Sequence, residues 1–297
     1  MLAVDRLTKR FGSTLAVDDL SFTATPGRVL GFLGPNGAGK TTTLRTLLGL
    51  TIPSSGTATV DGRGYRELRD AIGTVGAVLE GPQFHPGRTG RNHLRVLAAG
   101  AGLPASRADE VLRLVELDGA GRRRVKGYSL GMRQRLSLAG ALLGDPRALV
   151  LDEPANGLDP QGIRWLRDFL RGLAAGGRTV LVSSHVLAEV AQTVDEVVVI
   201  SRGRLVAEGG IDELTRDGAA PIRVRTRDPE RLRDALRAKG VAAEARGGNW
   251  LAIADSSLET VGETAAQHGL VVYELFKDRQ TLEDVFLELT GETEAGG

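Results

Sequence analysis

The 297-residue sequence contains no cysteine. It therefore forms no disulfide framework, thiolate nucleophile or cysteine metal site, and this fits a reducing compartment. No stretch approaches about 18 uninterrupted apolar residues, and charged side chains already occur within residues 1–10. We therefore expect neither a membrane-spanning helix nor a secretory signal.

The chain also lacks an excess of charge of either sign. Lys and Arg number 38 and Asp and Glu number 37, which gives a net charge of +1. Bulk charge therefore gives no reason to expect nucleic acid or acidic lipid as a partner, and a charged ligand needs a local site. We interpret the basic run at 122–126 as a solvated face, because acidic residues lie close to it in the sequence.

Strand-like and helix-like segments alternate through residues 1–215. Apolar runs that predict strands lie at 2–7, 16–22, 29–33, 148–151, 179–184 and 197–200. Strands that alternate with helices favour an α/β fold with a mainly parallel sheet. Helical patterns at 105–117 and 129–143 predict a helical insertion, at about 83–145, that stands beside the sheet.

A polar stretch of small residues at 216–221 predicts a linker and a separate accessory domain at 222–297. The domain's expected elements are a strand at 222–226, a helix at 229–239, strands at 241–245 and 250–254, a helix at 256–268 and a strand at 270–275. This is the order of a small α+β ferredoxin-like unit. A last helix at 282–289 has an apolar face, which should dock on an apolar surface.

A glycine-rich turn follows the strand at 29–33 and opens a helix. It matches G-x-x-x-x-G-K-[ST], the P-loop or Walker A motif, whose backbone N–H groups wrap phosphates. Lys40 reaches the β and γ phosphates in this motif, and the Thr41 hydroxyl is placed for Mg²⁺. A chance glycine turn is the weaker alternative, because strand and helix both lie where the motif needs them. The expected nucleotide-binding residues are Gly34, Pro35, Asn36, Gly37, Ala38, Gly39, Lys40, Thr41 and Thr42.

Two carboxylates and a histidine follow later strands. Asp152 closes the strand at 148–151, where it can reach the water shell of a metal ion. Glu153 is placed to polarise a water aimed at the γ-phosphate. A solvated Asp-Glu turn is the alternative, which the P-loop makes less favoured. His185 ends the strand at 179–184 and could bond the γ-phosphate or that water, whereas a lone histidine is more often structural; we interpret the other three histidines as structural.

These motifs, in this order, resemble the ATP-binding cassette (ABC) ATPases of membrane transporters. Residues 128–132 are similar to that family's signature L-S-G-G-Q: Ser129 and Gly131 are kept, and Leu130 and Met132 replace a glycine and the glutamine. In the family, the kept serine and glycine bind the γ-phosphate of ATP held by the opposite cassette. The resemblance therefore implies a head-to-tail pair with two shared ATP sites.

The same resemblance implies further roles. Phe11 would stack on adenine, Asp159 would belong to the D-loop at 156–159, and His185 would be the switch histidine. The structural alternatives are a core position for Phe11 and a helix cap for Asp159. Glu80 stands where the family usually has a glutamine that contacts Mg²⁺, so the implied metal residues are Thr41, Glu80 and Asp152.

The signature variant and the run at 282–291 are similar to bacterial drug-resistance and peptide-antibiotic exporter cassettes. This implies an ATP hydrolase that uses ATP and Mg²⁺, acts as a homodimer on the cytoplasmic face of the cell membrane, and energises separate transmembrane permease subunits. The alternative is a soluble ABC ATPase of the translation or DNA-repair type. Those types generally carry two cassettes or a long coiled coil, and this chain has one cassette and no heptads. A P-loop kinase would have no reason to contain the signature serine and glycine. The sequence names no cargo, and export rests on the resemblance alone.

Overall fold

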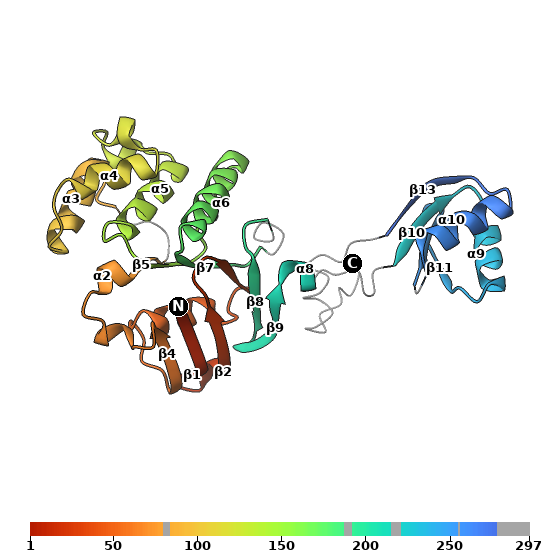
Figure 1. Cartoon of the computed structure of the whole chain (residues 1–297), viewed down its shortest axis with the longest axis horizontal. Helices are drawn as coiled ribbons and strands as arrows, with labels where there is room; N and C mark the ends of the chain where they lie inside the picture. The colour runs from red at the N-terminus through yellow and green to blue at the C-terminus, as the bar shows by residue number, and fades with distance from the viewer. Residues whose placement is uncertain (80–83, 187–191, 215–220, 255, 278–297) are drawn as a thin grey trace. The chain divides into compact units, whose positions relative to one another are not determined.

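The computed structural model describes residues 1–79, 84–186, 192–214, 221–254 and 256–277 (Figure 1). The chain divides into two compact units; the first contains Met1–Ile211 and the second begins at Asp212. The predicted linker at 216–221 lies almost wholly outside the described residues, as do Glu80 and the predicted helix at 282–289. The domain boundaries stay predictions.

A six-stranded sheet forms the centre of the first unit, in the strand order β5-β6-β7-β3-β8-β9. Its strands are β3 (Val29–Leu33), β5 (Val75–Val78), β6 (Ala148–Leu151), β7 (Thr179–Ser184), β8 (Glu196–Ser201) and β9 (Arg204–Gly210). All neighbours are parallel except β8 and β9, which are antiparallel. The α/β fold with a mainly parallel sheet is therefore confirmed.

A second, antiparallel sheet has the order β2-β1-β4, with β1 at Leu2–Phe11, β2 at Thr14–Ala24 and β4 at Ser55–Val60. Helix α1 (Lys40–Leu47) contacts all three strands. Buried side chains of this sheet, of α1 and of the central sheet form one apolar core, in which the rings of Phe22 and Phe32 stack with centroids 5.0 Å apart. This second sheet and β4 were not predicted from the sequence.

Helices α3 (Gly90–Gly100), α4 (Arg107–Leu114) and α5 (Leu130–Ala141) make up the predicted helical insertion. They contact one another, and α5 also contacts β5 (Figure 1). The other helical segments described in the first unit are η1 (Tyr65–Glu67), α2 (Ala71–Thr74), η2 (Asp118–Ala120), η3 (Val125–Gly127) and α6 (Pro160–Ala175), and α8 (Ile211–Leu214) begins at the boundary between the units. No helix in the described part of the chain combines the length and the apolar character needed to cross a membrane.

The second unit is a four-stranded antiparallel sheet in the order β11-β12-β10-β13. Its elements are β10 (Ile222–Thr226), α9 (Pro229–Ala238), β11 (Ala243–Arg246), β12 (Trp250–Ile253), α10 (Leu258–Gln267) and β13 (Val272–Lys277). Both helices bury leucine, valine and alanine side chains against Ile222, Val224 and Leu251. The order of strands and helices is the order predicted from the sequence.

Candidate active site

The glycine-rich loop between β3 and α1 is shaped by close backbone contacts. Gly39 has a φ of 105°, and a Cβ added there would lie 2.5 Å from the Ala16 carbonyl oxygen. A Cβ added at Gly34 would lie 2.3 Å from the Ile200 carbonyl oxygen. Both positions therefore require glycine, and the loop leads directly into the N-terminus of α1, where the helix dipole favours an anion.

Lys40 is the first residue of α1 and is only 5% exposed. Its Nζ donates hydrogen bonds to the carbonyl oxygens of Gly34 (2.7 Å) and Pro35 (3.2 Å), and lies 3.4 Å from Oε1 of Glu153. A buried ammonium group is costly unless it is paired and hydrogen-bonded. The loop and Glu153 therefore hold a positive charge inside the turn that is predicted to wrap phosphates.

Thr41 and Asp152 place two oxygen atoms that could bind a metal ion side by side. The Thr41 hydroxyl donates to Oδ2 of Asp152 at 2.8 Å, and Asp152 is 6% exposed. The described residues contain no cluster of three side chains able to hold a metal ion by themselves. Mg²⁺ is usually held by one or two protein oxygens together with substrate phosphates and water, so a hydroxyl and a carboxylate beside a phosphate loop fit this ion.

Glu153 and His185 meet at the carboxyl ends of neighbouring strands. Asp152 and Glu153 follow β6 and His185 follows β7, and the two strands are parallel, so these side chains reach the same sheet edge. Oε2 of Glu153 lies 2.8 Å from Nδ1 of His185. Glu153 has a left-handed backbone with a φ of 49°, which is uncommon outside glycine. The structure thus brings together Lys40, Thr41, Asp152, Glu153 and His185.

The signature residues lie at the start of α5. The Ser129 hydroxyl accepts a hydrogen bond from the Met132 N–H at 3.2 Å and caps this helix. A Cβ added at Gly131 would lie 3.8 Å from the Leu158 side chain, and one added at Gly157 would lie 2.6 Å from the Leu130 side chain. Within one chain, the start of α5 and the segment before α6 therefore pack closely together.

Asp159 and Phe11 test the structural alternatives directly. Oδ1 of Asp159 accepts a hydrogen bond from the Gly162 N–H at 2.8 Å, so Asp159 caps α6, as its alternative predicted. Phe11 ends β1 and is 51% exposed, with Nζ of Lys9 4.7 Å from its ring centroid. Phe11 is therefore not a core residue, and its ring is accessible for stacking.

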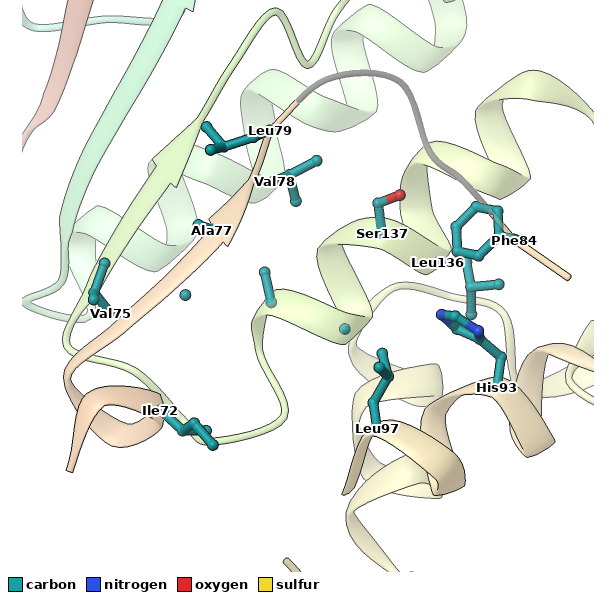
Figure 2. Close-up of a pocket in the computed structure, with 13 residues that line it drawn as sticks. Ile72, Val75, Ala77, Val78, Leu79, Phe84, His93, Leu97, Leu136 and Ser137 are labelled. Carbon is teal, nitrogen blue, oxygen red and sulfur yellow. The ribbon is translucent and has the colours of Figure 1, made fainter. Parts of the chain in front are cut away.

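An open cavity of about 470 Å³, lined mainly by apolar side chains and not predicted from the sequence, lies between β5 and helices α3 and α5 (Figure 2). Phe84, His93, Leu97 and Leu136 line it, among others. Nδ1 of His93 is buried and has no hydrogen-bond partner among the described residues. Burial lowers the pKa of His93, and the nearby positive charge of Arg88 lowers it further. The sequence offered no signal that separated this histidine from the other structural ones.

Two further predicted features differ in outcome. Glu80 lies outside the described residues, so its place near Mg²⁺ stays a prediction. The basic run is described: Arg122, Arg123, Arg124 and Lys126 are all exposed, in agreement with a solvated face.

Comparisons with known proteins cover nearly the whole chain. Residues 17–156 match the family model described as ABC transporter, and residues 220–283 match one described as a domain of unknown function. The uncharacterized ABC transporter ATP-binding protein YhcH of Bacillus subtilis is 38% identical, across 99% of this chain and 97% of the relative. The bacitracin transport ATP-binding protein BcrA of Enterococcus faecalis is 35% identical, across 98% and 96%. The Nod factor export ATP-binding protein I of Ralstonia nicotianae is 37% identical, across 98% and 94%.

The fold is shared with solved cassettes. A structure described as the ATP binding subunit of an ABC transporter has a TM-score of 0.65 and 28% identity, and the match covers 73% of this chain and 92% of that one. Because the sequence similarity extends over nearly all of the chain and the cassette fold accompanies it, the chain belongs to the ABC transporter ATP-binding proteins and is an ATP hydrolase.

Proposed function

We propose that this chain energises an export transporter by binding and hydrolysing Mg-ATP, as one of two copies attached to separate permease subunits at the cytoplasmic face of the membrane. The observation that carries the proposal is the convergence of Lys40, Thr41, Asp152, Glu153 and His185 at one sheet edge beside a glycine loop. The bacitracin transport relative supports a cargo of the drug or peptide-antibiotic class, and the Nod factor export relative supports export. They favour a transport ATPase over a soluble ABC ATPase of translation or repair.

Phosphate binding is the task of the loop at residues 34–42. The Lys40 ammonium group already lies inside the loop, and its bonds to two backbone carbonyls aim it there. Charge-assisted hydrogen bonds from an ammonium group to phosphate are stronger than those to neutral carbonyls. Phosphate oxygens would therefore displace part of this network and take Lys40 as their counter-charge.

Thr41 and Asp152 would hold Mg²⁺ through the hydroxyl and carboxylate oxygens that already share a hydrogen bond. The bound ion supplies neutralisation of charge on the phosphate oxygens. Glu80 is the third proposed metal residue.

Hydrolysis needs a water that is activated and aimed at the γ-phosphate. We assign the proton acceptor to Glu153, whose carboxylate is only partly buried, and the orienting contact to His185. Because one oxygen of Glu153 contacts Nδ1 of His185, the imidazole fixes the direction of the carboxylate. The second ring nitrogen, Nε2, is the atom we assign to the γ-phosphate or to the attacking water.

Other predicted residues of this chain are assigned to contacts with the partner copy and with the adenine base. Ser129 is exposed at the start of α5, and with Gly131 it would contact the γ-phosphate of ATP held by the opposite cassette. Asp159 would lie at the same shared interface. Phe11, with its exposed ring, would stack on adenine.

We assign the cavity beside β5 as the contact site of the permease subunit. It joins β5, which leads toward Glu80, to the helical insertion, so an apolar segment inserted there contacts both parts at once (Figure 2). An apolar segment that covers the apolar side chains of this lining would remove their surface from water, which favours the complex. The accessory domain at 222–297 is proposed to stabilise or tune the assembly without taking part in the chemistry.

Copurification and nucleotide trapping test the proposal together. The full chain should copurify from membranes with a polytopic protein, and Glu153→Gln with Mg-ATP should elute as a dimer in size-exclusion chromatography. Wild-type chain without nucleotide is the control and should elute as a monomer. A Glu153→Gln chain that binds ATP and remains monomeric at every ATP concentration would contradict the shared-site arrangement.

A further inference from the structure

Ser183 lies under the proposed metal and base residues, although no motif singles it out. It is the fifth residue of β7 and is fully buried. The parallel register pairs Leu151 of β6 with Val182 of β7. The residues that follow this pair, Asp152 and Ser183, are therefore brought side by side.

The Ser183 hydroxyl makes two contacts with successive residues. It donates a hydrogen bond to Oδ1 of Asp152. It also accepts a hydrogen bond from the backbone N–H of Glu153 at 2.9 Å. Asp152 is thus held from both sides, because its other oxygen, Oδ2, accepts from the Thr41 hydroxyl at 2.8 Å.

The second contact coincides with the unusual backbone of Glu153. Its φ of 49° lies in the left-handed region, which carries a conformational cost for a residue with a side chain. A hydrogen bond to the N–H of this residue helps to hold that conformation. The conformation in turn directs the Glu153 carboxylate toward Lys40 and His185.

We propose that Ser183 is a positioning residue that sets the Asp152 carboxylate for the metal ion and, through the backbone of Glu153, sets the proton acceptor for hydrolysis. The inference rests on the roles proposed for Asp152 and Glu153. A serine hydroxyl suits this place because it donates and accepts at once, and neither alanine nor valine does so.

Metal binding gives a readout that does not depend on turnover. The free Mn²⁺ signal in electron paramagnetic resonance, titrated with the full chain in the presence of ADP, reports metal affinity. Loss of a hydrogen bond to a charged group predicts a metal affinity weakened roughly 10-fold in Ser183→Ala. Steady-state ATPase should show a comparable fall in kcat with KM for ATP little changed. Ser183→Thr keeps the hydroxyl and should restore both values.

The matched control is Ser184→Ala. Ser184 is the next residue on β7 and is also buried, and among the described residues its hydroxyl hydrogen-bonds with the backbone of Val186. We expect metal affinity and kcat close to those of the wild type. If the alanine variant does not fold, Ser183→Cys replaces it in the test. The thiol fills a similar volume but is a weak hydrogen-bond donor, so metal affinity and kcat should fall as predicted for Ser183→Ala.

Two outcomes separate the inference from the function on which it rests. If Ser183→Ala and Ser183→Cys bind Mn²⁺ and turn over as Ser184→Ala does, while Asp152→Asn loses metal affinity, the positioning role of Ser183 is wrong and the metal assignment stands. If Asp152→Asn leaves metal affinity unchanged, the metal assignment itself is wrong.

Discussion

Lys40 and Glu153 are paired within the active site, with Nζ 3.4 Å from Oε1, and the second oxygen of the same carboxylate contacts His185. The residues proposed for phosphate binding, for proton transfer and for the switch histidine are therefore linked by direct contacts. In the proposed function, an incoming phosphate would compete with Glu153 for Lys40. This competition would couple nucleotide binding to the orientation of the proposed proton acceptor.

Lys40→Ala should lower nucleotide affinity, because it removes the counter-charge from the loop. Removing a hydrogen bond to a charged group should weaken the affinity for ATP roughly 10- to 100-fold. Isothermal titration with ATP measures the change. Lys239→Ala is the control, since Lys239 bonds Thr264 and Gln267 in the second unit. Unchanged affinity in Lys40→Ala would remove the phosphate-binding assignment.

Glu153→Gln should slow hydrolysis roughly 10²- to 10⁴-fold, because an amide does not accept the proton of the attacking water. The phosphate loop stays intact, so ATP binding should persist. Glu80→Gln should keep most basal hydrolysis, since an amide oxygen can still lie near Mg²⁺. Steady-state ATPase across a Mg²⁺ titration compares the two variants. Equal losses would mean that Glu80 takes part in the chemistry.

Leu97→Glu should uncouple the cassette from its permease by placing a charge among the apolar side chains that line the cavity. We expect basal ATPase close to the wild type and loss of the stimulation given by the membrane partner. Val96→Glu is the matched control: Val96 is the preceding residue of α3, it is 44% exposed against 42% for Leu97, and it does not line the cavity. Stimulation lost equally in both variants would argue against the cavity as the contact surface.

Stability should fall as the pH drops below about 6.5, and His93 should account for part of the fall. Its pKa in the folded protein lies below the ordinary value of 6.5, so the unfolded chain binds more protons in the range between the two values. Urea unfolding at several pH values measures this. His93→Leu should show a shallower decline than the wild type below pH 6.5. A slope identical to that of the wild type would mean that His93 makes no contribution.

The residues of the candidate site could be predicted from the sequence more completely than the elements around them. The strand at Val29–Leu33, the loop and the helix that starts at Lys40 follow local rules: an apolar run, glycines with special backbone geometry and a helix start. Asp152, Glu153 and His185 could be grouped because parallel strands present their carboxyl ends at one edge. The predicted element order of the second unit likewise depends mainly on local patterns.

Features that depend on tertiary contacts were not predicted. Strand β4 is mostly polar and is recognisable only through its pairing with β1. Helix α3 begins and ends with glycine, and its cap at Thr89 is clear only in the structure. The residues that surround Ser183 and His93 come from strands and helices distant in the sequence. No spacing along the chain therefore indicated their roles.

The close packing of Leu130 with Gly157 and of Gly131 with Leu158 has a consequence for timing. In the proposed head-to-tail pair, the start of α5 serves the nucleotide of the opposite copy, while the segment at 157–158 lies a few residues beyond the chain's own Glu153. In that pair, loss of a phosphate from one nucleotide would change the contacts of the segment at 157–158, and this packing would pass the change to the start of α5 at the other nucleotide. The two ATP molecules are therefore expected to be consumed in a correlated sequence rather than as independent events.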